Sequence, residues 1–141
     1  MDPRDAALAL ARGRIAFALT ALLAPGVSSR FMFGRRADIP GTRVFARMLG
    51  GRDLAIGLGA VIALDRGAPV RGWLEAGALA DGVDAATVLA ARDELSSRIV
   101  AGTLAIGGVA AAAGMLLARQ LDPAPAAEPG QPEAIVTGHP S

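Results

Sequence analysis

The feature that most limits the fold of this chain is a run of twenty residues, 99–118, without any charged side chain. An apolar run of this length can cross the hydrocarbon layer of a bilayer as one α-helix. Three further apolar stretches precede it, at about residues 6–23, 44–64 and 73–91. Because short segments connect them, we predict an all-α protein over residues 1–121, a four-helix transmembrane bundle with up-down-up-down topology.

The composition favours a membrane location. Hydrophobic residues make up 52% of the 141 residues, whereas only 19% are charged and 4% are aromatic. The mean hydropathy is +0.44. Ala, Gly, Leu and Val carry the apolar content, and small residues let helices approach closely in lipid. We therefore expect a multi-pass protein of the cell membrane surrounded by lipid, and a net charge of +1 gives no basic face for nucleic acid.

The first apolar stretch is interrupted by Arg12 and Arg14. Its clean part is short, so we expect this helix to begin among the headgroups, with both arginines extending toward water. A signal peptide is the alternative, because basic residues precede a short apolar run. Pro25-Gly26 makes a poor cleavage site for a signal peptidase. Whether this helix is retained stays open at this point.

The remaining segments predict connections and a tail. Residues 25–41 mix aromatic and basic side chains (Phe31, Phe33, Arg35 and Arg36 among them), which is typical of a headgroup-layer segment or of an ordinary loop. Residues 65–69 predict a turn, and Ser96 or Ser97 is expected to cap the fourth helix. Residues 122–141 are rich in Pro, Ala, Glu and Gly and are predicted to be disordered.

Charge does not decide the orientation in the membrane. With four spans, equal numbers of arginines fall on the two sides. One side carries Arg4, Arg12, Arg14, Arg66, Arg71 and Arg119, and the other carries Arg30, Arg35, Arg36, Arg43, Arg92 and Arg98.

Charged residues lie in the middle of two apolar stretches. Arg52 and Asp53 interrupt the second stretch, and Asp81 and Asp84 interrupt the third. A charge at the centre of a membrane helix costs about 2.5–3.5 kcal/mol on insertion scales, so it usually faces a partner or a water-filled cavity. If these two helices form an antiparallel hairpin, the four residues lie within about 2–3 Å of one depth. We therefore predict an intramembrane polar cluster of Arg52, Asp53, Asp81 and Asp84.

Two hypotheses follow from this cluster. In the first, the chain is a structural or accessory membrane protein, and the cluster holds helices two and three in register. In the second, it is a small carrier or sensor for protons or a solute. Three carboxylates around Arg52 leave an excess of negative charge, so Asp81 or Asp84 is expected to hold a proton or a cation. A second copy or another membrane protein is the partner to expect. Gly107-xxx-Ala111 fits a helix-contact pattern, but in a chain so rich in glycine and alanine this pattern does not report on oligomers.

No enzyme activity, cofactor or metal site is expected. The chain lacks cysteine and lysine, and its only histidine, His139, lies near the end, so the serines have no activating base. The segment Asp81-Gly82-Val83-Asp84-Ala85 is similar to the aspartate-rich metal sites of membrane phosphotransferases. Those sites need a second carboxylate pair and an arginine where this chain has Ala86. One pair does not hold the divalent metals that phosphoryl chemistry requires.

Part of the chain resembles a family of small bacterial four-helix integral membrane proteins described only as a domain of unknown function. The residues that carry the resemblance are Arg52-Asp53-Leu54-Ala55-Ile56-Gly57-Leu58-Gly59, Trp73, Gly77, Asp81 and Asp84. The resemblance covers about residues 44–89, with a compatible fourth helix after them. It implies a four-helix integral membrane protein and brings no activity with it.

Overall fold

The computed structural model describes residues 2–34 and 40–121, and the chain is all-α within them, with five α-helices and no strand. The elements are α1 (Pro3–Leu23), α2 (Pro25–Phe33), α3 (Pro40–Asp65), α4 (Arg71–Ala90), the short 3₁₀ turn η2 (Arg92–Glu94) and α5 (Ser97–Leu121). The all-α prediction is confirmed, and the four long helices coincide with the four apolar stretches. The tail predicted to be disordered lies outside the described residues.

Local sequence signals set the ends of the long helices. The Asp2 carboxylate accepts a hydrogen bond from the backbone N–H of Arg4 at 3.1 Å, and Pro3 occupies the first helical position of α1. Ser96 Oγ accepts a hydrogen bond from the N–H of Ile99 at 3.4 Å, as predicted for the cap of α5. Gly67 adopts a φ of 62° in the turn after α3, a conformation that favours glycine.

Helix α2 occupies the first part of residues 25–41, for which a headgroup-layer segment or an ordinary loop was expected and no helix was predicted. Pro25 is the first residue of α2, where its missing N–H has no cost. Ser29 is fully buried, and its hydroxyl donates a hydrogen bond to the carbonyl of Thr42 at 3.4 Å, which fastens α2 to the start of α3. The side chains at positions 31, 33, 35 and 36 lie outside the described part of the molecule.

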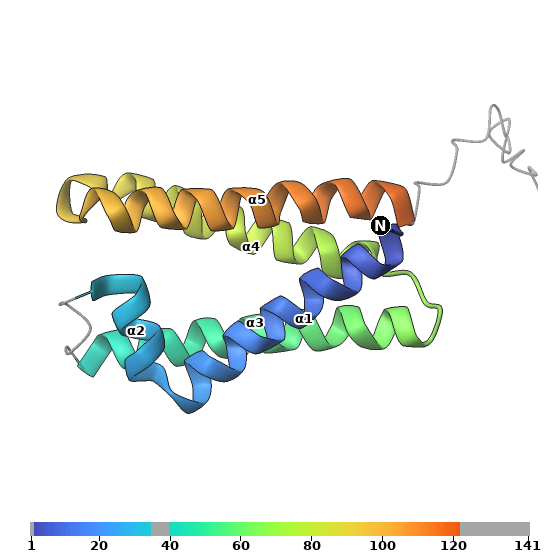
Figure 1. Ribbon diagram of the computed structural model, residues 1–141, viewed down its shortest axis with the longest axis horizontal. Coiled ribbons are helices and arrows are strands. Elements are labelled where there is room, and N and C mark those ends of the chain that lie inside the picture. Colours follow the sequence, from blue (N-terminus) through green and yellow to red (C-terminus); the bar gives the residue numbers. More distant parts are fainter. Residues whose placement is uncertain (1, 35–39, 122–141) are drawn as a thin grey trace, which may run out of the picture.

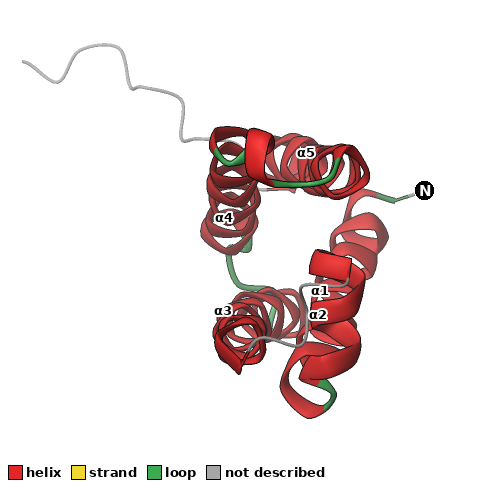
Figure 2. Ribbon diagram, turned by 90° about the vertical axis from the view of Figure 1, so that its left-hand side faces the viewer, coloured by secondary structure: helices red, strands yellow, loops and turns green. Residues whose placement is uncertain are grey.

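The long helices pack as two antiparallel pairs. Helix α1 packs mainly against α3, and α4 packs mainly against α5. The two pairs lie opposite each other and are linked through the α3–α4 turn (Figures 1 and 2). Helices α3 and α4, which were expected to form a closely packed hairpin, therefore make only limited contact, because α3 packs against α1 and α4 packs against α5.

A stripe of small residues brings α1 and α3 together. Residues on both helices recur at alternating intervals of four and three, the spacing of a helix–helix seam. Its small members are Ala7, Ala11, Ala18 and Ala21 on α1 and Ala46, Gly50, Gly57 and Ala60 on α3, and Arg14, Asp53 and Leu64 occupy the remaining positions of the same spacing. A Cβ atom added at Gly50 would lie 2.9 Å from Ala21 Cβ, and one at Gly57 would lie 2.8 Å from Ile15 Cγ1. The two backbones can approach this closely only because both positions are glycine.

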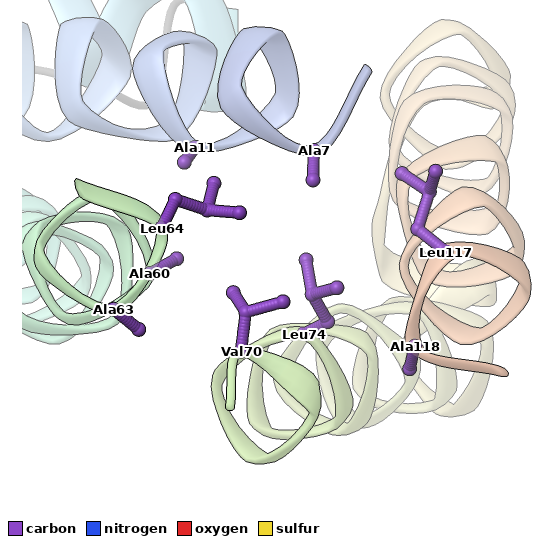
Figure 3. Packing of buried hydrophobic residues seen from close by; sticks show 9 residues of the cluster. All are labelled: Ala7, Ala11, Ala60, Ala63, Leu64, Val70, Leu74, Leu117 and Ala118. Atoms are coloured by element: carbon purple, nitrogen blue, oxygen red, sulfur yellow. The ribbon is translucent and has the colours of Figure 1, made fainter. Parts of the chain in front are cut away.

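One end of the molecule is closed by an apolar core that draws on all four long helices (Figure 3). Its buried residues are Ala7, Ala11, Ala60, Ala63, Leu64, Val70, Leu74, Leu117 and Ala118. The guanidinium group of Arg4 donates a hydrogen bond to the carbonyl of Leu64 at this end and satisfies the end of α3. The α3–α4 turn lies at the same end, so this core fixes the turn end of both helix pairs.

Side-chain size is distributed in the reverse of the usual pattern. Among the residues whose side chains are described, most buried apolar residues are alanines, whereas many large apolar side chains are exposed, among them Leu58, Leu79 and Val109. Helices α1 and α5 are long and apolar enough to cross a membrane. Lipid is as apolar as leucine, so membrane helices associate through small residues and turn large ones outward. The distribution is typical of helices in lipid.

Candidate functional site: an ion cluster beside a cavity

Five charged side chains meet halfway along the long helices and form one connected network. Arg14 comes from α1, Arg52 and Asp53 come from α3, and Asp81 and Asp84 come from α4. The structure thus brings together the four residues of the predicted polar cluster and adds Arg14. We call these five residues the ion cluster.

Arg14 joins the first helix pair to the second. Its Nη2 lies 2.6 Å from Asp81 Oδ2 and its Nη1 lies 3.3 Å from Asp81 Oδ1, so the pair has two parallel hydrogen bonds. The same Nη1 donates to Asp53 Oδ1 at 3.1 Å. Only 9% of the Arg14 side chain is exposed. A planar guanidinium group suits this two-pronged contact with a carboxylate, and it stays charged in any surroundings.

Arg52 makes a second pair of the same geometry one turn further along α4. Its Nη1 and Nη2 donate to the two oxygens of Asp84 at 3.0 and 2.7 Å. This pair is more open than the first, since 32% of the Arg52 side chain and 34% of the Asp84 side chain are exposed. The predicted equal depth of Arg52 and Asp84 is thus seen as a direct ion pair.

Asp53 connects the two pairs. Its Oδ1 accepts a hydrogen bond from Nη1 of Arg14 at 3.1 Å and another from Nε of Arg52 at 3.1 Å. Asp53 is buried, with 5% of the residue exposed, because it occupies the small-residue seam between α1 and α3. Within the described residues, every buried side-chain nitrogen or oxygen has a hydrogen-bond partner. The cluster is therefore a satisfied network, as a stable buried polar group requires.

Gly77 makes room for Arg14 on α4. A Cβ atom at this position would lie 3.0 Å from Nη2 and 3.3 Å from Cζ of Arg14. Gly77 precedes Asp81 by one helical turn, so its bare backbone forms the surface beside which the guanidinium group lies. A site on three helices thus depends on a residue without a side chain.

The position of Arg14 corrects two expectations. Arg14 does not extend toward water as Arg12 does, because its place in the alanine seam of α1 directs it between the helices. The cluster therefore joins three helices, rather than helices two and three alone. The signal was present in the sequence, since the intervals from Ala7 and Ala11 to Ala18 and Ala21 run through position 14 and miss position 12.

The added arginine also changes the charge balance. Two arginines and three aspartates leave one formal negative charge, where Arg52 alone would leave two. Charge without a counter-charge is costly away from water. The cluster is thus nearly balanced, with an excess of a single carboxylate.

A cavity of about 590 Å³ adjoins the ion cluster. All four long helices line it, and all five residues of the cluster contribute to its wall. The remaining wall is mostly apolar and includes Phe17 of α1, Leu49 of α3 and Ile106 of α5. The cavity extends to Arg98 and Ile99 in the first turn of α5, the end of the molecule opposite the apolar core. Figure 2 shows the four long helices around this central region.

Arg71 and Glu75 form an ion pair at 2.7 Å on the surface of α4, as their spacing predicts. Among the described residues, no group of three or more His, Cys, Asp or Glu side chains is placed to hold a metal ion.

Comparison with known protein families, with curated proteins and with solved structures gives no match for this chain. The resemblance to small bacterial four-helix membrane proteins therefore stays a prediction.

Proposed function

We propose that this chain is a multi-pass protein of the cell membrane in which α1, α3, α4 and α5 cross the bilayer as an up-down bundle. The observation that carries the proposal is the outer surface of α3 and α4. The exposed positions of α3 from 48 to 62 and of α4 from 76 to 90 carry no charge, because the mid-helix charges of both helices turn inward, and the surface pair of Arg71 and Glu75 lies near the start of α4. Helices α1 and α5 are long and apolar enough to cross a membrane by their overall composition.

Single-cysteine labelling tests this placement, because the natural chain has no cysteine. Cysteines at Leu58, Leu79 and Val109, which are exposed on α3, α4 and α5 and lie outside the cavity wall, should resist a membrane-impermeant maleimide in intact membranes. Cysteines at Ala68 and Asp93, which lie in the two connections, should react from opposite sides. Reaction at all five positions would show that these helices do not cross the bilayer. The side from which Ala68 reacts also gives the orientation.

Within the membrane, we propose a structural or accessory role in which the ion cluster fixes the register of the two helix pairs. The support is geometric, since the two bidentate arginine–aspartate pairs both connect α4 to helices of the other pair. The role requires a partner, either a second copy or another membrane protein. Helix α1 supplies Arg14 and packs along α3, which supports its retention in the mature protein.

The register role is tested with Arg52→Gln, Asp84→Asn and the double variant. Each single change leaves a charge without its partner and should lower the thermal stability of the purified protein. The double change should restore part of the loss, since it removes both members of the pair. If Asp84→Asn instead keeps or raises stability, that carboxylate is held at a cost to the fold, which is the mark of a functional group.

The cavity favours a second candidate, a small carrier or sensor for protons or a solute. Asp84 is the better placed of the two candidate aspartates, because its side chain is 34% exposed and that of Asp81 is 13% exposed. Carboxylates inside membrane domains commonly mark proton or solute pathways. Reconstituted protein in vesicles should then accumulate or release a solute in a manner that Asp84→Asn abolishes.

A further inference from the structure

The cavity has the dimensions of a small-molecule site. Its volume of about 590 Å³ falls within the range of about 300–1,000 Å³ that ligand pockets occupy. Its wall combines apolar side chains, such as Phe17 and Ile106, with a concentrated polar region at one place. This combination of an apolar wall and a few polar groups is what fixes the position of a ligand in such sites.

The charge of the polar region determines whether a cation or an anion is the better ligand beside it. The ion cluster has one negative charge more than its arginines balance. Inside a bilayer the surroundings have a low dielectric constant, so an uncompensated charge attracts a counter-charge strongly. A ligand with one positive charge would bring the cluster to neutrality, whereas an anion there would double the excess. Arg98 balances the charge of the cavity wall as a whole, so the preference for a cation belongs to the end of the cavity beside the ion cluster.

Asp84 is the group that such a cation would meet. Its two oxygens offer about four lone-pair positions, of which the two N–H groups of Arg52 occupy two. The Asp84 side chain is 34% exposed and lines the cavity, so its remaining lone pairs are accessible from there. Asp53 and Asp81 are covered by the arginines and by neighbouring helices.

Arg98 sets the direction in which the ligand lies. It lines the far end of the cavity and has no ion-pair partner among the described residues. Gly107, beside the backbone of Asp81, lies nine residues further along α5, which is about 13 Å at the rise of a helix. The positive end of a ligand should therefore lie near Asp84, with its apolar body between Phe17, Leu49 and Ile99.

We infer that the cavity beside the ion cluster binds an amphipathic organic cation, with its positive group at Asp84 and its apolar body against the walls from α1, α3 and α5. The inference deepens the carrier or sensor reading proposed above and rests on it. It does not depend on whether the cluster also fixes the helix register.

Two probes of the same shape and opposite charge provide the test. Tetraphenylphosphonium and tetraphenylborate carry four phenyl groups each, so a difference between them reports the sign of charge that the cavity prefers. Equilibrium dialysis of the purified natural protein should show saturable binding of tetraphenylphosphonium at least about tenfold tighter than that of tetraphenylborate. Thr103→Trp, which fills the cavity, should abolish this binding, whereas Ala105→Trp on the outer face of α5 should not.

Two further variants locate the charge. Asp84→Asn should weaken tetraphenylphosphonium binding by about tenfold or more, and Glu75→Gln is the matched control, since it removes a paired carboxylate from the same helix outside the cavity. Arg98→Gln should strengthen binding, because it removes a positive charge from the far end. If Asp84→Asn does not fold, the two probes on the natural protein still decide the question.

The unfavourable outcomes are separable. Equal binding of the two probes, or tighter binding of tetraphenylborate, overturns the choice of a cation and leaves the cavity as a ligand site. Absence of saturable binding of both probes overturns the inference of an organic-cation site, while the carrier or sensor role is decided separately by the vesicle experiment with Asp84→Asn. Neither outcome affects the placement in the membrane or the register role, which have their own tests.

Discussion

Arg14 of α1 and Asp81 of α4 form an ion pair with two contacts, at 2.6 and 3.3 Å, although α1 packs mainly on α3 and α4 mainly on α5. The pair therefore spans the interface between the two helix pairs. Arg52 and Asp84 make the same connection from α3 at 2.7 Å. Away from the apolar core at the α3–α4 turn, these ion pairs are the polar contacts that hold the halves together.

The Arg14–Asp81 pair should be strongly coupled in stability. We expect Arg14→Gln and Asp81→Asn each to lower the free energy of unfolding by about 3–5 kcal/mol, because each leaves a buried charge without its partner. The double variant should lose less than the sum, with a coupling of about 0.5–3 kcal/mol. Denaturant unfolding of the purified protein in detergent measures all four free energies. The exposed pair of Arg71 and Glu75 is the control and should couple by about 0.2–1 kcal/mol.

A methyl group at position 77 should destabilise the protein, because it would crowd the guanidinium group of Arg14. Gly77→Ala places a Cβ atom 3.0 Å from Arg14 Nη2, so the guanidinium group must move by a few tenths of an ångström while two carboxylates hold it in place. We expect a loss of about 1–3 kcal/mol in the free energy of unfolding. Gly82→Ala on the same helix meets nothing within 4 Å and should be neutral or stabilising by up to about 1 kcal/mol. Equal effects of the two changes would argue against the placement of Arg14 beside Gly77.

The α1–α3 seam should depend on glycine at one of two adjacent positions. A Cβ atom at Gly50 would meet Ala21 Cβ at 2.9 Å and the carbonyl oxygen of Ala18 at 3.0 Å, whereas one at Gly51 meets nothing within 4 Å. Because backbone cannot move aside as a flexible side chain does, Gly50→Ala should push the helices apart and cost about 1–3 kcal/mol. Gly51→Ala should not destabilise the protein. Thermal unfolding compares the two variants, and a stable Gly50→Ala protein would mean that α1 and α3 are not in this close contact.

The sequence allowed the long helices and most of the ion cluster to be predicted, because both depend on simple periodicities. Long uncharged runs limit the chain to helices, and counting residues from the turn at 65–69 places Arg52 at the depth of Asp84. Helix α2 was missed, since nine residues of mixed composition carry too short a pattern and only Pro25 marks their start.

Arg14 and the cavity could not be predicted in the same way. Arg14 follows Arg12 near the start of an apolar run, which is also the position of an arginine that extends to the headgroups, and only the alanine intervals of α1, which pass through position 14 and miss position 12, distinguish the two cases. The cavity depends on the separation of the two helix pairs. Gly50 and Gly57 bring α1 and α3 together and Gly114 brings α4 and α5 together, whereas no single-helix pattern contains the distance between the two pairs.

The single tryptophan reports on the contact between the two helix pairs near their turn end. Trp73 lies over Gly59 of α3, so that a Cβ atom at Gly59 would lie 2.5 Å from two ring atoms. In Gly59→Ala the indole ring must therefore leave this surface, and its exposed fraction, now 42%, should rise. Quenching of the tryptophan fluorescence by acrylamide should increase relative to the natural protein. Gly72→Ala, next to the tryptophan but facing open space, should leave quenching unchanged. If both variants quench alike, the ring does not lie on α3, and the contact between α3 and the start of α4 must be placed elsewhere.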